Sequence, residues 1–132
     1  MEVRYLVEDD YHKLCDWWKD WRWPVISKDF LPENGTGGLM ISSNGVDVCA
    51  GFVYMTNSKV AWIEFIVSNF HYREKDRKEA IELLIYSLLE ICKQKGLLYA
   101  FSTLKSPSLI KMYENCGFQK GSTNTTEMIK TL

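Results

Sequence analysis

The stretch Val60-Ala-Trp-Ile-Glu-Phe-Ile-Val67 is followed by a polar turn, Ser68 to Arg73, and by a helical pattern from Lys75 to Lys95. The first part is rich in β-branched and aromatic residues, and only Glu64 interrupts its apolar run. This pattern predicts a central strand that is buried on both faces. The helical part repeats apolar residues at three- and four-residue spacing, which predicts broad packing on a sheet. A strand that leads directly into a long helix indicates an α/β domain.

The bulk composition indicates one soluble domain that spans residues 1–132. Apolar residues make up 46% of the chain and charged residues 25%, close to ordinary globular values. The formal net charge of −1 gives no general attraction to nucleic acid or to an anionic membrane. The charged N-terminus and the absence of a long apolar run predict a cytoplasmic protein without a membrane partner.

The four cysteines do not form a recognisable metal or disulfide pattern. They are scattered singly, without a CxxC pair and without a neighbouring histidine, so we predict no metal site and four reduced, structural thiols. They are Cys15, Cys49, Cys92 and Cys116.

The N-terminal part predicts a short strand from Val3 to Val7 and a helix from about Glu8 to Trp21. Most of the tryptophans gather at the end of this helix, before a loop from Val25 to Gly38 that contains a helical turn near Asp29. Such a density of aromatic rings could line a binding pocket, whereas core and lid packing is the alternative for most of them. The residues predicted to bind substrate are Trp18, Trp21, Trp23 and Phe30.

A hairpin is predicted between the loop and the central strand. Its strands run from Leu39 to Ser43 and from Val46 to Thr56, and Asn44-Gly45 supplies the positive φ angles of a tight turn. Gly51, inside the second strand, indicates a bulge or a close backbone approach.

Three more elements follow the long helix. Leu97 to Thr103 predicts a strand, and Ser106-Pro107 predicts the cap and first residue of a short helix that ends at Gly117. A last strand is predicted around Glu127 to Leu132.

Two of these segments resemble motifs of the GNAT acetyltransferases. The run Ser106-Pro107 through Tyr113-Glu114-Asn115-Cys116-Gly117-Phe118 is similar to motif B, and Ile63 through Arg73 is similar to the strand and turn of motif A. The order of elements also matches. The resemblance implies an α/β (α+β) fold with a mixed, mostly antiparallel sheet of six or seven strands. It further implies that the strand Val60 to Val67 splays from Leu97 to Thr103, with helices flanking the sheet.

The resemblance implies an N-acetyltransferase that moves an acetyl group from acetyl-CoA to a primary amine, on a small molecule or a peptide N-terminus. The protein would act as a monomer or homodimer. Tyr113 would protonate the departing thiolate, and a backbone amide near Ile66 or Val67 would polarise the thioester carbonyl. Glu64 is the one acid of the central strand and could accept the proton of the amine. A carboxylate paired with Lys or Arg at the edge of the core is the alternative role for Glu64.

The turn before the long helix departs from the family. Asp76 and Lys78 stand where the resemblance implies glycines that let the backbone approach a pyrophosphate. The neighbouring cations could hold phosphate through side chains instead, or the turn could be a polar helix start without a ligand. In the latter case the chain would be a GNAT-fold binding or structural protein that has lost acetyl-CoA. The residues predicted to bind the cofactor are Ile66, Val67, Ser68, Arg73, Lys75, Asp76, Arg77, Lys78 and Ser106.

Overall fold

The computed structural model describes residues 1–132 and contains one mixed sheet of five strands. The strands follow one another across the sheet in chain order, so each strand pairs with its neighbour in the sequence. The first four strands pair antiparallel, and the fifth pairs parallel to the fourth. The strands are β1 (Glu2–Tyr5), β2 (Gly38–Ser43), β3 (Val46–Met55), β4 (Val60–Ser68) and β5 (Tyr99–Phe101).

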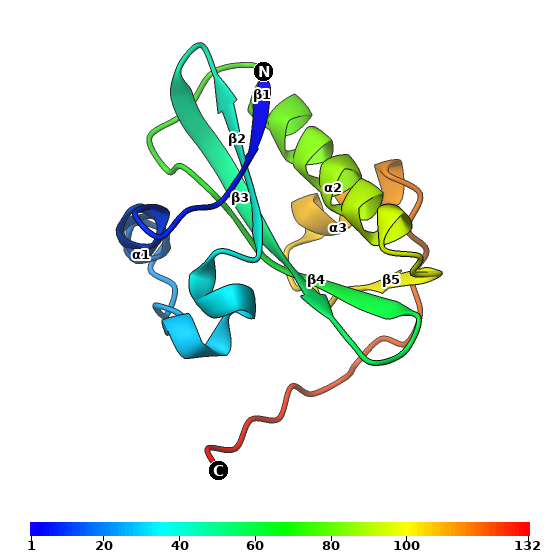
Figure 1. Cartoon of the computed structure of the whole chain (residues 1–132). Helices are drawn as coiled ribbons and strands as arrows, with labels where there is room; N and C mark the ends of the chain where they lie inside the picture. The colour runs from blue at the N-terminus through cyan, green and yellow to red at the C-terminus, as the bar shows by residue number, and fades with distance from the viewer.

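Helices cover both faces of this sheet (Figure 1). The long α2 and the short α3 lie on one face, whereas α1 and two 3₁₀ turns lie on the other. No helix has the length and apolar character needed to cross a membrane. The helices are α1 (Asp10–Asp20), α2 (Arg77–Gln94) and α3 (Pro107–Asn115), and the 3₁₀ turns are η1 (Lys28–Phe30) and η2 (Pro32–Gly35).

Each face of the sheet has its own apolar core. Under α2, the side chains of Leu84 and Leu88 pack with Ile63 of β4, and all three are fully buried. On the opposite face, Trp18 of α1 packs with Phe52 of β3. Burial of each such side chain stabilises the fold by roughly 1.5–3 kcal/mol relative to exposure. The central part of the sheet is therefore covered on both faces, as the apolar run of β4 predicts.

The predicted mixed α/β fold is confirmed, but the predicted number of six or seven strands is wrong. Glu127 to Leu132 forms no strand, and Met128 and Ile129 are 85% and 69% exposed. The neighbouring edge explains this difference, because β5 has only three residues to which a further strand could bond. So few ladder hydrogen bonds do little to offset the conformational entropy lost on ordering the tail.

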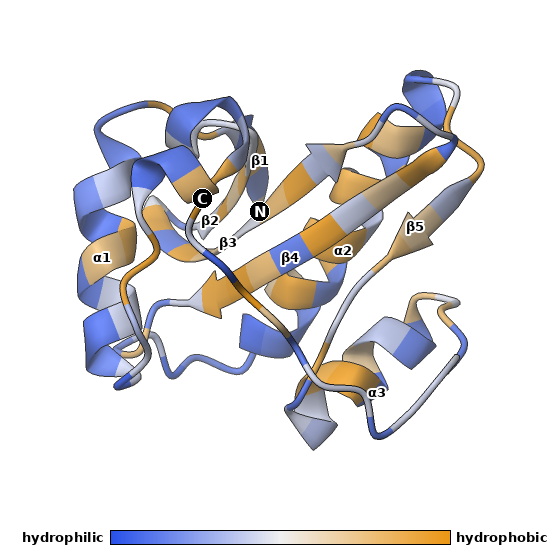
Figure 2. Ribbon diagram, turned by 90° about the horizontal axis from the view of Figure 1, so that it is seen from below, coloured by the Kyte–Doolittle hydropathy of each residue, from blue (hydrophilic) through white to orange (hydrophobic).

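The centre of the sheet contains a bulge and a splay. Ala50 pairs with Val67 and Phe52 pairs with Glu64, so Gly51 alone stands opposite two residues of β4. One of them, Phe65, has φ of 57°. This confirms the predicted irregularity at Gly51. The pairing between β4 and β5 covers only three residues of each strand, after which the two strands separate, as Figure 2 shows.

Gly38 is the tightest glycine in the sheet, and we expect Gly38→Ala to be strongly destabilising. A Cβ atom there would lie 2.0 Å from the carbonyl oxygen of Gly51, a backbone atom that cannot turn aside. The free energy of unfolding should fall by about 3 kcal/mol or more. Gly121→Ala is the matched control, because its Cβ would meet no atom within 4 Å. Urea unfolding of both variants tests the prediction, and equal stabilities would contradict it.

A buried carboxylate joins β1 to α1. The carboxylate of Asp10 accepts hydrogen bonds from both terminal nitrogens of Arg4, at 2.8 and 2.9 Å, and from the backbone N–H of Val7 at 2.8 Å. The hydrogen bonds from Arg4 are the main cause that lowers the pKa of Asp10. A depressed pKa contributes stability that is present above the unfolded pKa, near 4, and is lost as the pH falls through the folded pKa.

We therefore expect Asp10→Asn to lower the free energy of unfolding by about 1–2 kcal/mol at pH 7, because the charge-assisted bonds to the half-exposed Arg4 are lost. At pH 3 the difference between wild type and variant should shrink. Urea unfolding at both pH values checks this expectation. A difference that stays the same at pH 3 would show that the carboxylate charge is not the cause.

Candidate functional site

Polar groups bridge the opening where β4 and β5 separate. Glu64 Oε1 accepts from the indole Nε1 of Trp62 at 2.6 Å, and from the backbone N and Oγ1 of Thr103 at 2.6 and 2.7 Å. The hydroxyl of Ser102 donates to the carbonyl of Ile63 at 2.7 Å. Glu64 forms no ion pair with Lys or Arg, so its alternative role as a paired carboxylate does not hold. One oxygen of Glu64 is fixed by the splay, and Oε2 makes no hydrogen bond.

Tyr113 of α3 places a buried phenol in the same region. The residue is 2% exposed, and its hydroxyl is the one buried side-chain polar atom without a hydrogen-bond partner. Its ring packs edge-on against Phe118, with the centroids 4.8 Å apart. Burial raises the pKa of Tyr113, the nearby Ser102 hydroxyl opposes that shift, and the charge of Glu64 adds to it. The raised pKa keeps the phenol protonated at physiological pH.

The bulge in β4 distinguishes between the two amides predicted to polarise a carbonyl. Val67 pairs with Ala50 in the ladder, whereas Phe65 and Ile66 share the single opposing residue Gly51. A bulge leaves its extra residue outside the regular ladder. Of the predicted pair, the amide of Ile66 is therefore the better candidate for a free donor.

The turn after β4 brings two arginines together without a carboxylate between them. Arg77 Nη2 donates to Ser68 Oγ at 2.8 Å, and the Arg73 guanidinium lies 4.7 Å from the ring centroid of Phe70. Neither arginine forms an ion pair; the ion pairs of the chain involve Arg4, Lys13 and His71. Burial and the neighbouring charge of Arg73 both lower the pKa of Arg77. Two adjacent unpaired guanidinium groups are suited to a phosphorylated anion.

Asp76 lies at the start of α2, but its carboxylate is engaged elsewhere. It accepts from Ser43 Oγ at 2.8 Å and from the hydroxyl of Tyr72 at 2.5 Å. These bonds, that of Tyr72 first, lower the pKa of Asp76. The structure therefore does not support the prediction that Asp76 binds the cofactor, because its side chain ties the turn to β2.

The two lysines of the turn are less constrained than the arginines. Lys75 and Lys78 are exposed and make no side-chain hydrogen bond or ion pair. Lys75 lines an open, polar cavity of about 560 Å³, which also borders Arg73 and the tip of the β2–β3 hairpin. Any contribution of the lysines to phosphate binding would therefore come from long-range attraction that salt screens.

Ser106 acts as the predicted cap of α3. Its Oγ accepts from the backbone N–H of Leu109 at 3.4 Å and lies 2.9 Å from the hydroxyl of Ser108. Pro107 follows at the first helical position, where its missing N–H costs nothing. The exposed serine cap remains a predicted cofactor contact.

The four aromatic residues predicted to form the acceptor pocket lie in three separate parts of the structure. Trp18 is buried in the core between α1 and the sheet, so its side chain packs and does not face the site. Trp23 is 46% exposed and stacks on Trp21, with centroids 5.6 Å apart, beside the two arginines. Phe30 lies instead near the bulge, 6.0 Å from the ring of Phe65.

Sequence reasoning missed two residues of this region. Phe70 contacts both Trp21 and Arg73, and Tyr54 donates its hydroxyl to the carbonyl of Phe30 at 2.8 Å. An aromatic residue three positions before Arg73 was the available signal for Phe70. Tyr54 had none, because its partner is far away in the sequence.

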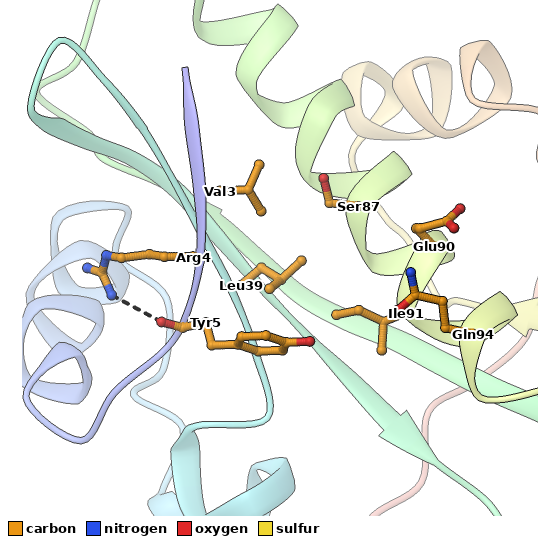
Figure 3. A pocket seen from close by; sticks show the side chains of 8 residues that line it. All are labelled: Val3, Arg4, Tyr5, Leu39, Ser87, Glu90, Ile91 and Gln94. Carbon is orange, nitrogen blue, oxygen red and sulfur yellow. Dashed lines mark hydrogen bonds between the residues drawn. The ribbon is translucent and has the colours of Figure 1, made fainter.

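A second cavity lies on the face of the sheet that α2 covers (Figure 3). It has a volume of about 220 Å³ and lies between the edge strand β1 and α2. Val3 and Leu39 face Ile91 across it, and Glu90 and Gln94 border it from the helix. It contains none of the predicted site residues. No group of three or more His, Cys, Asp or Glu side chains is placed to hold a metal.

No family model matches the chain, and no curated protein is detectably similar in sequence. The structure, in contrast, matches solved acetyltransferases over nearly its whole length. The ribosomal-protein-S18-alanine N-acetyltransferase from Escherichia coli is 15% identical with a TM-score of 0.73, over 92% of this chain and 79% of that chain. An acetyltransferase from Trypanosoma brucei is 20% identical with a TM-score of 0.67, over 97% and 99% of the two chains.

A third similar structure contains a coenzyme analogue. AAC(6′)-Iy, in complex with the bisubstrate analogue CoA-S-monomethyl-acetylneamine, is 14% identical with a TM-score of 0.68, over 98% of both chains. The chain therefore has the fold of the GNAT acetyltransferases.

Proposed function

We propose that this chain is an N-acetyltransferase that transfers the acetyl group of acetyl-CoA to a primary amine. The observation that carries the proposal is the Tyr113 hydroxyl, which is buried, protonated and unpartnered beside the open splay of β4 and β5. A buried hydroxyl without a partner costs roughly 1–3 kcal/mol, which the fold offsets elsewhere. A ligand atom that accepts a hydrogen bond from the Tyr113 hydroxyl would explain why the chain keeps this hydroxyl.

The chemistry requires three groups, and the chain has a candidate for each. Attack of a neutral amine on the thioester carbon forms a C–N bond and places negative charge on the carbonyl oxygen. The amide of Ile66 in the bulge would stabilise that charge. The C–S bond then breaks, and Tyr113 would donate its proton to the leaving sulfur.

The amine must lose a proton before or during attack. Glu64 is the acid of the splay, and its Oε2 makes no hydrogen bond, so we assign it as the group that accepts this proton directly or through water. The three bonds to Oε1 hold the carboxylate in place.

The coenzyme would be held by side chains where the resemblance implies glycines. Arg73 and Arg77 carry unpaired positive charge beside Ser68 and the first turn of α2, and these groups would hold the diphosphate of acetyl-CoA. When bound, acetyl-CoA supplies the activated acetyl group. The acceptor would enter beside Phe30 and Phe65, whose aromatic rings suit a small amine or a peptide N-terminus better than a strongly basic tail.

A binding protein without catalysis is the second candidate, and one observation favours it. Asp76 and Lys78 replace the small residues that let a phosphate approach the backbone. Their Cβ atoms stay in place in every rotamer, so a change of rotamer does not restore the space that a glycine leaves. Such a protein would have lost acetyl-CoA binding and catalysis, and would serve as a binding or structural module.

Release of coenzyme A thiol distinguishes the two candidates. Purified protein is incubated with acetyl-CoA and a panel of small aliphatic amines, aromatic amines and peptides with a free N-terminus, and the free thiol is followed with a colorimetric reagent. We expect thiol release that depends on both acetyl-CoA and at least one amine. Absence of thiol release with every one of these amines, together with no detectable binding of acetyl-CoA, would favour the binding or structural protein.

A further inference from the structure

Trp21 links the end of α1 to the arginine-containing turn. Its Nε1 donates to the backbone carbonyl of Ser68 at 2.8 Å. The side chain of the same serine accepts from Arg77. One residue at the end of β4 therefore receives a bond from the tryptophan on its backbone and a bond from the arginine on its hydroxyl.

The indole also lies against the charged groups of the turn. The guanidinium carbons of Arg77 and Arg73 lie 5.2 and 5.8 Å from its ring centroid, and Phe70 packs edge-on at 4.9 Å. A guanidinium over an aromatic face is attracted by the electron density of the ring. Aromatic rings thus hold the two like charges together, in place of the carboxylates that usually do so.

No carboxylate forms an ion pair with either of these arginines, and two acids close to them in the structure are engaged elsewhere. The carboxylate of Asp76 is bonded to Ser43 and Tyr72, and that of Asp20 lies 3.5 Å from His71. Burial, followed by the repulsion from Arg73, lowers the pKa of Arg77. An anion with two charges would relieve the repulsion, because each guanidinium can donate to a phosphoryl oxygen.

The backbone at the end of α1 fixes the position of the indole. Arg22 follows the helix with φ of 60°, and the N–H of Trp23 returns to the carbonyl of Trp18 at 2.8 Å. This helix-terminating arrangement places Trp23 against Trp21 in a stacked pair with an interplanar angle of 20°. The ring is thus held between a second indole, the phenyl ring of Phe70 and the arginines.

We propose that Trp21 is a positioning residue that holds Arg73 and Arg77 together as a clamp for the diphosphate group of the substrate. The inference rests on the proposed function in that acetyl-CoA supplies the diphosphate. It moves Trp21 from the acceptor pocket, where the sequence placed it, to the coenzyme side. It also makes the clamp depend on docking of α1 against the end of β4.

Calorimetric titration with inorganic pyrophosphate and with acetyl-CoA tests the clamp. Trp21→Ala should weaken the binding of both by roughly tenfold, because it removes the ring from two cations. Trp21→Phe keeps an aromatic face but loses the bond to Ser68, and should remain within about threefold of wild type. Trp17→Phe is the control, because Trp17 is a core residue of the same helix. It should lower the melting temperature and leave the affinity for pyrophosphate unchanged.

A second readout separates positioning from a general loss of structure. The affinity of wild type for pyrophosphate should fall steeply with salt, and that of Trp21→Ala should fall less steeply, because fewer cations engage the ligand at once. Wild-type affinity in Trp21→Ala, or equal losses in Trp21→Ala and Trp17→Phe, would overturn the clamp and leave the proposed function standing. If the wild-type chain binds neither pyrophosphate nor acetyl-CoA, the clamp and the proposed function both fail.

Discussion

Tyr113→Phe is expected to lower kcat by about 10²–10⁴-fold while leaving the affinity for acetyl-CoA nearly unchanged. The variant removes only the hydroxyl, which would act on the sulfur as the thioester breaks and not on the bound nucleotide. Because this hydroxyl is buried without a partner, its loss should not reduce the free energy of unfolding. Steady-state kinetics with the best acceptor, together with calorimetry and thermal unfolding, provide the three measurements.

The pH dependence gives an independent check on the same residue. Burial raises the pKa of Tyr113 above its usual value near 10, so the phenol keeps its proton below that value and kcat should not fall through its ionisation between pH 7 and 10. If turnover in Tyr113→Phe equals that of wild type, the tyrosine only packs α3 against Phe118, and another group protonates the leaving sulfur.

The double variant Arg73→Ala with Arg77→Ala should lose binding of acetyl-CoA by about 100-fold or more. Each guanidinium would make charge-assisted bonds to phosphate, worth roughly 1.5–3 kcal/mol apiece, and no other side chain in the turn is fixed in the same place. Calorimetric titration of acetyl-CoA into wild type and variant measures the loss.

Lys75→Ala with Lys78→Ala is the matched control, since it removes the same amount of charge from exposed lysines whose side chains make no hydrogen bond or ion pair. We expect it to weaken binding by about threefold at low salt and by less at high salt. An equal loss in both double variants would show that the turn attracts phosphate by net charge alone, without a built site.

The sequence predicted the order of the elements and most of their boundaries because local signals determine them. The apolar run of β4 and the cap at Ser106 each reflect the physics of one segment. The bulge at Gly51 was also predictable, because an isolated glycine in a strand usually marks such a site. The absence of the last strand was not predictable, because pairing of the tail depends on the length of β5 at the edge of the sheet.

The partners of charged side chains were less accessible to sequence reasoning. Nothing near Asp76 in the sequence indicates that its carboxylate would accept hydrogen bonds from both Ser43 on β2 and Tyr72. Likewise, Trp18 and Trp21 are close in the sequence and equally apolar, yet one is buried in the core and the other contacts two arginines. These outcomes depend on which elements meet in three dimensions.

Thermal unfolding with and without acetyl-CoA tests the central claim most directly, namely that this fold still binds the coenzyme. A ligand that binds only the folded state stabilises it by RT ln(1 + [L]/Kd), about 2.7 kcal/mol at a hundredfold excess over Kd. For a domain of this size, that predicts a rise in melting temperature of roughly 5–10 °C in wild type. The Arg73→Ala with Arg77→Ala variant should show no rise. An unchanged melting temperature of the wild-type protein at millimolar acetyl-CoA would contradict the account.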